Sequence, residues 1–337
     1  MPVKLTTASK PFSRNSTERV STKGLTLVEL LVGASIGLII LSTAFALTLS
    51  SRKLYDMDRS RTEINQNLRT TSDIVGAGVR IAGERLGSRN NFPVAAIEIR
   101  NGTELVLRRN MLDATLPLCE KKLNTNEDNI CVSLKNDGQG VKLADSPQCA
   151  AANSDSDGDG VPDALAAWRA YRQKYGPEVG GYIFTNGTGK KDFFVYDGDD
   201  GSDFKIHTKT NRVNIYEISE RPILILVEET TYRLRGDTLE RVLNQNEDKD
   251  SGKGKSKSKK KEENENKVQQ LANNLSNFQV RAIMKDGSVL KDYTGAGTAW
   301  TDLVAIEVSL TGRISQGGKP LERTFTSRFF PRNVLSN

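Results

Sequence analysis

The chain has 337 residues and a formal net charge of +6 at pH 7, and 36% of its residues are hydrophobic. That length suits one large domain or two small ones, and that composition restricts any membrane segment to a single local feature. The basic surplus lies in residues 1–24 and 246–267, so a nucleic-acid partner has no support from charge. A single histidine, His207, excludes most histidine-dependent triads and polyhistidine metal chemistry, and we expect no enzymatic activity.

The first predicted element is an apolar helix that begins near Leu25. Residues 30–51 carry no charge, which matches the roughly 20 apolar residues that a helix needs to cross a bilayer. The basic stretch and Gly24 precede this run, whereas a secretory signal peptide has its cleavage site after its apolar run. Glu29 stands alone in the run, where an unpaired carboxylate costs about 3 kcal/mol, so we expect a specific partner for it. If the chain is cut after Gly24, the new amine of one subunit can neutralise Glu29 of its neighbour in a filament.

The segment Lys23-Gly24-Leu25-Thr26-Leu27-Val28-Glu29 resembles the processing motif of the type IV pilin and type II secretion pseudopilin superfamily. The resemblance implies a leader, residues 1–24, that a prepilin peptidase removes, followed by N-methylation of Leu25. It also implies a subunit held in a bacterial inner membrane, which joins other pilins through its N-terminal helix and Glu29. The chain departs from the family at Leu25, where most members have Phe, and its leader is longer than many. An ordinary signal anchor with an isolated Glu is the alternative.

The helix is predicted to continue beyond the membrane as an amphipathic segment over residues 52–87. Its first part, 25–51, is expected in lipid or in a filament core, and its second part on a globular head. Apolar residues at spacings of three and four form one stripe of the second part; they are Leu54, Met57, Ile64, Leu68, Val75, Val79, Ala82 and Leu86. The helix is expected to end near Gly87, before the break at Asn90-Asn91-Phe92-Pro93.

From residue 93 to 337 the apolar period is two, which predicts an antiparallel β-sheet head and an α+β fold. Asn101-Gly102 and Gly236-Asp237 mark two hairpins, and Gly317-Gly318 joins the last two strands. The predicted strands are residues 94–100, 103–109, 193–197, 204–208, 212–218, 223–234, 302–314 and 321–330. Four segments resemble PilW-type minor pilins and J-type pseudopilins, namely Tyr232–Arg241, Leu271–Arg281, Leu303–Leu310 and Arg323–Asn333.

Two stretches of the head are expected to be rich in loops, an insertion at about 110–192 and the Lys-rich residues 246–267. The second is of low complexity, and we interpret it as a disordered, solvated excursion before a short helix, because its acidic flanks largely cancel its lysines. A polyanion-binding arm is the alternative. The insertion contains the three cysteines of the chain. In an oxidising compartment Cys119 and Cys131 are the natural pair, while Cys149 is left over or replaces either partner.

A calcium loop is predicted at residues 154–163, Ser-Asp-Ser-Asp-Gly-Asp-Gly-Val-Pro-Asp. Asp at positions 1, 3, 5 and 9 and Gly at position 6 let a chain wrap one hard cation in oxygen ligands. The expected ligands are the carboxylates of Asp155, Asp157, Asp159 and Asp163 and the carbonyl of Val161, and a helix follows over Ala164–Tyr175. The loop resembles those of EF-hand-like, dockerin and thrombospondin type 3 repeats, but Ala166 stands at position 12, where they have an acidic ligand.

A second acidic turn, residues 197–203, is a further candidate that either completes this site or forms another. Its carboxylates are those of Asp197, Asp199 and Asp203. For both turns the alternative is a solvated acidic loop. The expected role of calcium is to rigidify the insertion.

Together these features favour a minor type IV pilin, a structural subunit that initiates or joins a pilus after cleavage between Gly24 and Leu25. A pseudopilin of a type II secretion-like apparatus is the first alternative, because it has the same assembly physics. A membrane-anchored calcium-dependent adhesin is the second, and it needs neither the cleavage nor a partner for Glu29.

Overall fold

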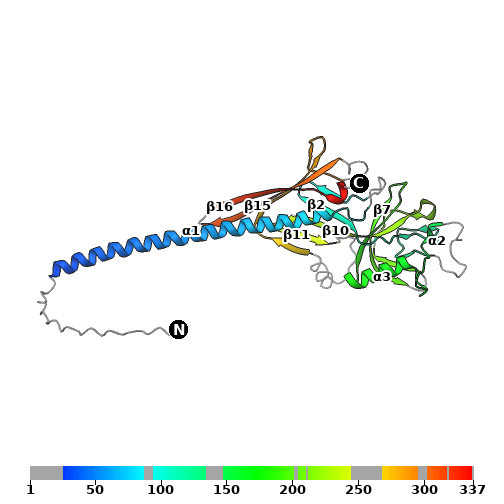
Figure 1. Ribbon diagram of the computed structural model, residues 1–337, viewed down its shortest axis with the longest axis horizontal. Helices are drawn as coiled ribbons and strands as arrows, with labels where there is room; N and C mark the ends of the chain where they lie inside the picture. The colour runs from blue at the N-terminus through cyan, green and yellow to red at the C-terminus, as the bar shows by residue number, and fades with distance from the viewer. Residues whose placement is uncertain are drawn as a thin grey trace, which may run out of the picture. The chain divides into compact units, whose positions relative to one another are not determined.

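The computed structural model describes residues 26–86, 94–133, 147–200, 204–209, 212–243, 268–294, 302–316 and 319–335. The chain divides into two compact units, residues 1–59 and 60–337. The leader, Leu25, Asp203, the Gly317-Gly318 turn and the Lys-rich stretch lie outside the described residues. The described part contains one long helix and antiparallel sheets (Figure 1), so the predicted α+β class is confirmed.

The long helix α1 extends from Leu27 to Ile81. In the second unit its stripe is buried as predicted from Ile64 onward, whereas Leu54, in the first unit, is 58% exposed. The helix ends six residues before Gly87, and two positive φ angles then turn the chain, 80° at Gly83 and 56° at Arg85. The other helices are α2 (Pro147–Ala151), α3 (Asp163–Tyr175) and α5 (Arg332–Leu335), with a 3-10 turn η2 (Ile218–Glu220).

The larger sheet is antiparallel and contains both N-terminal hairpin strands. Its strands are β1 (Ile97–Arg100), β2 (Glu104–Asn110), β3 (Leu116–Pro117), β5 (Asn129–Cys131), β6 (Val179–Phe184), β7 (Lys191–Asp200), β8 (Lys205–Lys209), β10 (Ile223–Arg235), β11 (Thr238–Leu243) and β12 (Val268–Ala272). The main path is β1-β2-β10-β6-β7-β8-β5, and β3 and β11 also pair with β10. The hairpins predicted at Asn101-Gly102 and Gly236-Asp237 are confirmed, since Arg100 pairs with Glu104 and Arg235 with Thr238.

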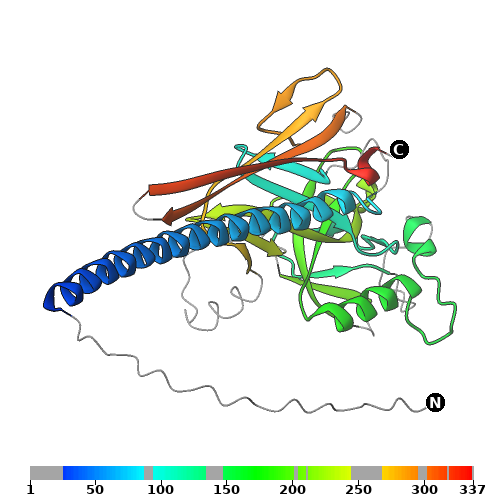
Figure 2. The same ribbon diagram turned by 60° about the vertical axis from the view of Figure 1, so that its left-hand side comes forward.

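A second antiparallel sheet has the order β14-β13-β15-β16. Its strands are β13 (Leu275–Met284), β14 (Val289–Leu290), β15 (Leu303–Gln316) and β16 (Lys319–Phe329). Within the second unit, α1 lies against β15 and β16 in both views (Figures 1 and 2). The approach is close because Gly76 has no side chain: a Cβ there would lie 2.2 Å from Cε1 of Phe329.

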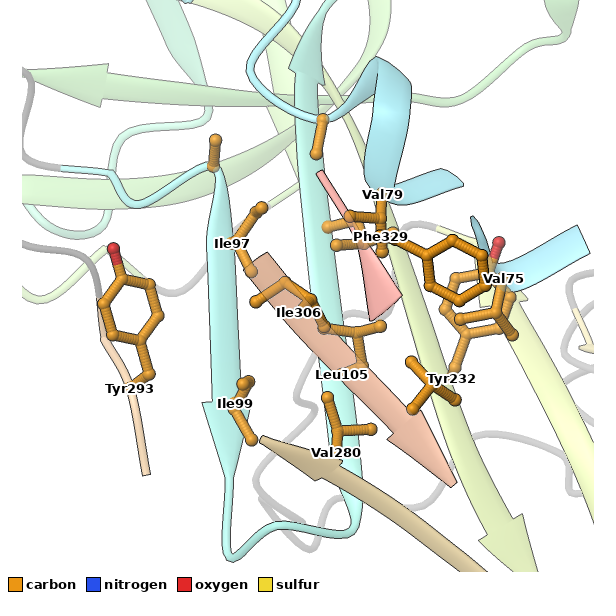
Figure 3. Packing of buried hydrophobic residues seen from close by; sticks show 14 of the residues in the cluster. Val75, Val79, Ile97, Ile99, Leu105, Tyr232, Val280, Tyr293, Ile306 and Phe329 are labelled. Carbon is orange, nitrogen blue, oxygen red and sulfur yellow. The ribbon is translucent and has the colours of Figure 1, made fainter. Parts of the chain in front are cut away.

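Strand β10 separates two hydrophobic cores. Successive side chains of a strand point to opposite faces, and Leu224 and Leu226 enter one core while Ile225 and Val227 enter the other. The first core packs α1 against both sheets, with Val75, Phe329 and Tyr232 among its members (Figure 3). The second packs α3 on the strands of residues 110–210 and has Trp168 fully buried at its centre.

Three predictions for the head need correction. Residues 110–192 are not an insertion separate from the sheet, because β3 and β6 pair directly with β10 and help to build it, although loops connect most of their described elements. Residues 212–218 form only the short strand β9 (Tyr216–Glu217), which pairs with β4 (Lys122–Leu123). The short helix expected after the Lys-rich stretch is instead β12, which continues the sheet from β11. In each case tertiary pairing overrides a weak local pattern.

Candidate membrane helix and aspartate loop

The N-terminal half of α1 exposes apolar side chains all around the helix. It contains one stretch that is long and apolar enough to cross a membrane, and no side chain in that stretch is buried. Large exposed residues continue from Leu27 to Leu49, with Leu38, for example, 67% exposed. A helix that is apolar on every side is typical of a membrane span or of the interior of an assembly.

Glu29 has a local partner that the sequence analysis did not consider. Oε2 of its carboxylate accepts hydrogen bonds from the backbone N–H and the hydroxyl of Thr26, both at 3.0 Å. The Thr26 hydroxyl oxygen in turn accepts the Glu29 N–H at 3.3 Å. This is a capping box, which satisfies N–H groups at a helix start, and its Thr-x-x-Glu signal was readable in the sequence. Glu29 therefore helps to cap the start of α1 as well as placing a charge in it, while Gly24 and Leu25 lie outside the described residues.

The aspartate loop is wound around its own carboxylates. Asp155 accepts the N–H groups of Gly158, at 2.8 Å, and Gly160, at 2.9 Å. Both glycines have positive φ angles, 75° and 83°, which side chains other than glycine rarely adopt. One carboxylate oxygen each from Asp155, Asp157 and Asp159 lies within 4.8 Å of the others. Two ligands on opposite sides of a calcium ion, each 2.3–2.6 Å from it, are about 5 Å apart, so this spacing fits one such ion.

Asp163, predicted as a fourth carboxylate ligand, is instead bound within the loop. Its carboxylate accepts the Ser156 N–H at 3.0 Å and the hydroxyls of Ser156 and Ser154 at 2.7 and 3.1 Å. The N–H and hydroxyl of Ser156 hold the pKa of Asp163 below its usual value. Asp163 thus closes the loop at the first residue of α3, and no described contact brings it to the other three carboxylates. The Val161 N–H donates to Asp159 at 2.7 Å, and the ligand role of the Val161 carbonyl stays a prediction.

The two described carboxylates of the second acidic turn, those of Asp197 and Asp199, are paired with basic side chains. Asp197 and Asp199 lie in β7, and the register with β8 shifts between Tyr196 and Gly198, at Asp197. The Asp199 carboxylate pairs with Arg169 at 2.7 Å and Arg172 at 3.3 Å, and Asp197 pairs with Lys209 at 3.3 Å. Two arginines and one lysine therefore compensate the carboxylate charges that were predicted to bind a metal. Asp203 lies outside the described residues.

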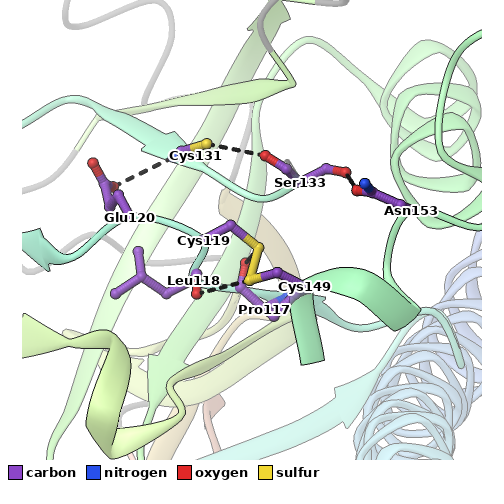
Figure 4. Close-up of a disulfide and its surroundings, with 8 residues drawn as sticks. All are labelled: Pro117, Leu118, Cys119, Glu120, Cys131, Ser133, Cys149 and Asn153. Atoms are coloured by element: carbon purple, nitrogen blue, oxygen red, sulfur yellow. Dashed lines mark hydrogen bonds between the residues drawn. A yellow bond between two sulfur atoms is a disulfide. The ribbon is translucent and has the colours of Figure 1, made fainter. Parts of the chain in front are cut away.

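The disulfide joins Cys119 to Cys149, with Cα atoms 5.7 Å apart, so the predicted Cys119–Cys131 pair is wrong (Figure 4). Cys131 lies beside Cys119 through a main-chain contact. The Cys119 N–H donates to the Cys131 carbonyl at 2.8 Å. The Cys131 thiol, however, donates to the Ser133 carbonyl at 3.1 Å. Helix α2 brings Cys149 to Cys119 instead. Cys149 therefore replaces Cys131 as the partner of Cys119, the alternative that the sequence left open.

No protein-family model matches the sequence, and no curated protein is found to be similar to it. What the chain does is inferred from its own residues.

Proposed function

We propose that this protein is a minor pilin, a structural subunit that enters a type IV pilus through α1. The observation that carries the proposal is the unbroken apolar surface of α1 from Leu27 to Leu49, with Glu29 alone near its start. Such a surface needs lipid or other apolar helices around it, and in lipid a helix satisfies all its own backbone groups. The same apolar surface of α1 would contact lipid while the subunit is in the membrane and the helices of its neighbours after assembly.

Glu29 supports assembly rather than simple anchoring. The capping box gives its carboxylate two donors but no positive charge. Within a helix bundle in lipid, that negative charge is costly, and a neighbouring N-terminal amine would neutralise it. Because the amine of mature Leu25 and Glu29 lie close to the helix start, one such contact per neighbour would fix the axial register of the subunits.

The state of the N-terminus tests this proposal directly. We expect mass spectrometry of the protein purified from membranes to find a chain that starts at an N-methylated Leu25. A chain that starts at Met1 would favour the monomeric anchored adhesin, which needs no cleavage. The pseudopilin alternative predicts the same N-terminus and is separated by the neighbouring genes, which would encode a secretin and secretion components rather than pilus proteins.

We further propose that the aspartate loop binds calcium and that the ion stiffens the start of α3. Three carboxylates with a suitable spacing, in a loop turned by two glycines, support this proposal. The absence of an acidic residue at position 12 predicts weak binding, which millimolar extracellular calcium would still satisfy. Asp163 is better described as the residue that closes the loop than as a ligand.

Thermal unfolding of the full chain in detergent tests the calcium site. An ion present at a hundred times its Kd stabilises the folded state by about 2.7 kcal/mol, which raises the Tm of a protein of this size by several degrees. We expect that rise with calcium in the parent and its loss in Asp157→Ala. Lys122→Gln, an exposed substitution outside the loop, is the control. An equal rise in parent and Asp157→Ala would contradict the site.

A further inference from the structure

A cleft of about 520 Å3 lies on the second unit, between α3 on one side and the end of β2 and the middle of β10 on the other. Its α3 wall consists of Ala167, Ala170, Tyr171, Lys174 and Tyr175, whose spacing of three and one places them on one helix face. The volume is in the range of about 300–1,000 Å3 that is usual for small-molecule sites. The side chains of the two alanines are small, so they leave space between the tyrosines and the opposite side of the cleft.

The floor of the cleft is a half-buried ion pair. Arg109 and Glu228 are register partners on β2 and β10, and Nη2 of Arg109 lies 3.0 Å from Oε1 of Glu228. A second carboxylate, that of Glu84, lies 3.7 Å from Nη1 of Arg109. The charge of Arg109 is therefore already compensated, while the two carboxylates present acceptor oxygens to the cleft.

Arg85 forms the far wall in a backbone conformation that is unusual for a residue with a side chain, with φ at 56°. Asn110 holds it there: its Nδ2 donates to the Arg85 carbonyl at 3.2 Å, and its N–H donates to the Glu84 carbonyl at 2.9 Å. The Arg85 guanidinium donates to the Met111 carbonyl at 3.2 Å and lies 3.5 Å from the carboxylate of Asp113, which is 85% exposed. Strained residues that surrounding contacts hold in place are concentrated at functional sites, and here the strain places a cation at the rim.

The α3 wall adds a second cation and an aromatic surface. The rings of Tyr171 and Tyr175 are 4.4 Å apart at their centroids, and Tyr175 is 60% exposed. Nζ of Lys174 lies 5.0 Å from the centre of the Tyr175 ring, and in the described part of the chain no carboxylate pairs with it. Burial raises the pKa of Tyr171 to about 12, so its hydroxyl stays a neutral hydrogen-bond donor.

We infer that this cleft binds an acidic saccharide. Arg85 and Lys174 at its rim are cations that attract an anion. The acceptor oxygens of Glu84 and Glu228 can accept hydrogen bonds from hydroxyl groups on the same ligand. The tyrosines and alanines offer an apolar surface for the C–H face of a sugar ring. A uronic acid sugar combines these three properties, while a simple anion lacks the hydroxyls and a neutral sugar lacks the charge.

Binding of oligogalacturonate to the full chain tests this inference by titration calorimetry, in a detergent without a sugar headgroup. The methyl-esterified oligomer keeps the rings and loses the charge, and we expect it to bind about tenfold more weakly or not at all. Free galacturonate separates a site for one sugar from a site that needs a chain. Equal affinity for the acid and its ester would overturn the assignment of an anionic ligand, and failure of the acid to bind at millimolar concentration would overturn the site.

Variants then locate the binding. Arg85→Gly removes the guanidinium and tolerates the positive φ, and Lys174→Gln and Tyr175→Ala alter exposed side chains, so we expect a folded protein in each case. Each should weaken oligogalacturonate binding by about tenfold, while Gln173→Ala and Lys122→Gln, outside the cleft, should not. Unchanged affinity in all three cleft variants would overturn the location. Glu29→Ala should bind the sugar normally, so this inference and the proposed assembly fail independently.

Discussion

The two halves of α1 have one backbone conformation and opposite surfaces. Over residues 27–49 large apolar side chains are exposed on all sides, and Leu38 is 67% exposed. Over residues 60–81 the helix is mainly polar, with one buried stripe in which Leu68 is 2% exposed. A stripe matches a single flat partner, here the sheets of the second unit, whereas an apolar surface all around requires a surrounding medium.

The difference teaches where the partner of each half lies. The second half buries Ile64, Leu68, Val75 and Val79 in a core made by the same chain. The apolar residues of the first half have no comparable cover among the described residues, so their partner is expected outside the chain, in lipid or in other subunits. Substitutions in the first half of α1 should therefore affect assembly, and matched substitutions in the second half should affect the stability of the head.

The largest expected effect is on assembly. Glu29→Ala removes the carboxylate that a neighbouring amine would contact, and we expect its incorporation into filaments to fall more than tenfold while the head unfolds as in the parent. The measurement is the amount of the subunit in sheared filament fractions relative to the membrane fraction.

Glu29 also caps its helix, and Thr26→Val separates the two roles. That variant removes the Thr26 hydroxyl from the capping box but leaves the carboxylate, at a cost of about 1 kcal/mol in helix stability. We expect it to assemble nearly as well as the parent. If Thr26→Val fails as severely as Glu29→Ala, Glu29 acts only as a cap and the intersubunit contact is wrong.

Leu68→Ala and Leu38→Ala apply the same substitution to the two halves. Removal of the buried Leu68 side chain should destabilise the head by about 2–5 kcal/mol, because a cavity is left in its core. Leu38→Ala should leave the unfolding of the head unchanged, since its side chain contributes nothing to that core. Chemical denaturation of both variants in detergent checks this, and equal destabilisation would show that the halves do not differ as described.

Periodicity carried most of the fold prediction. The stripe from Ile64 to Leu86 and the two described hairpins were readable because each depends on residues close in sequence. The pairing of β6 with β10 was not, because these strands are about forty residues apart and nothing local in either one selects the other. The same limit explains the disulfide: Cys149 reaches Cys119 only through the placement of α2.

The site predictions divide in the same way. The spacing of Asp155, Asp157 and Asp159 along one tight turn brings their carboxylates together as the sequence indicated. Asp199 carries an equally acidic signal, yet Arg169 and Arg172 of α3 pair with it across the fold. The saccharide cleft had no sequence signal, because Arg85, Lys174 and Glu228 come from three distant segments.

Glycines in the two halves of α1 allow the same comparison, with a smaller expected effect on head stability. Gly76→Ala places a methyl group where the nearly buried ring of Phe329 lies, and we expect a loss of about 1–3 kcal/mol in head stability. Gly37→Ala meets nothing within 4 Å among the described residues and should leave head stability unchanged. Thermal unfolding of the two variants is the test, and a Gly76→Ala protein as stable as the parent would mean that α1 packs less closely on β16 than described.

The smallest expected effect concerns a carboxylate of the head, for comparison with Glu29. Burial raises the pKa of Glu120 to about 7 from its usual 4.5, the charge of Glu127 adds to the rise, and the Cys131 N–H opposes it. Between these two pH values the folded state holds a proton that the unfolded state releases. Stability from this group is therefore complete below pH 4.5 and is lost as the pH rises through about 7.

Glu120→Gln keeps the shape of the side chain without the titration. We expect it to match the parent at pH 4.5 and to exceed it at pH 8 by about 1–2 kcal/mol, a value reduced for the partial exposure of the group. Denaturation of both proteins between pH 4.5 and 8 measures this difference, in which titrations common to both cancel. A difference independent of pH would mean that folding does not raise the pKa of Glu120, so that burial in the head leaves this carboxyl with its usual titration.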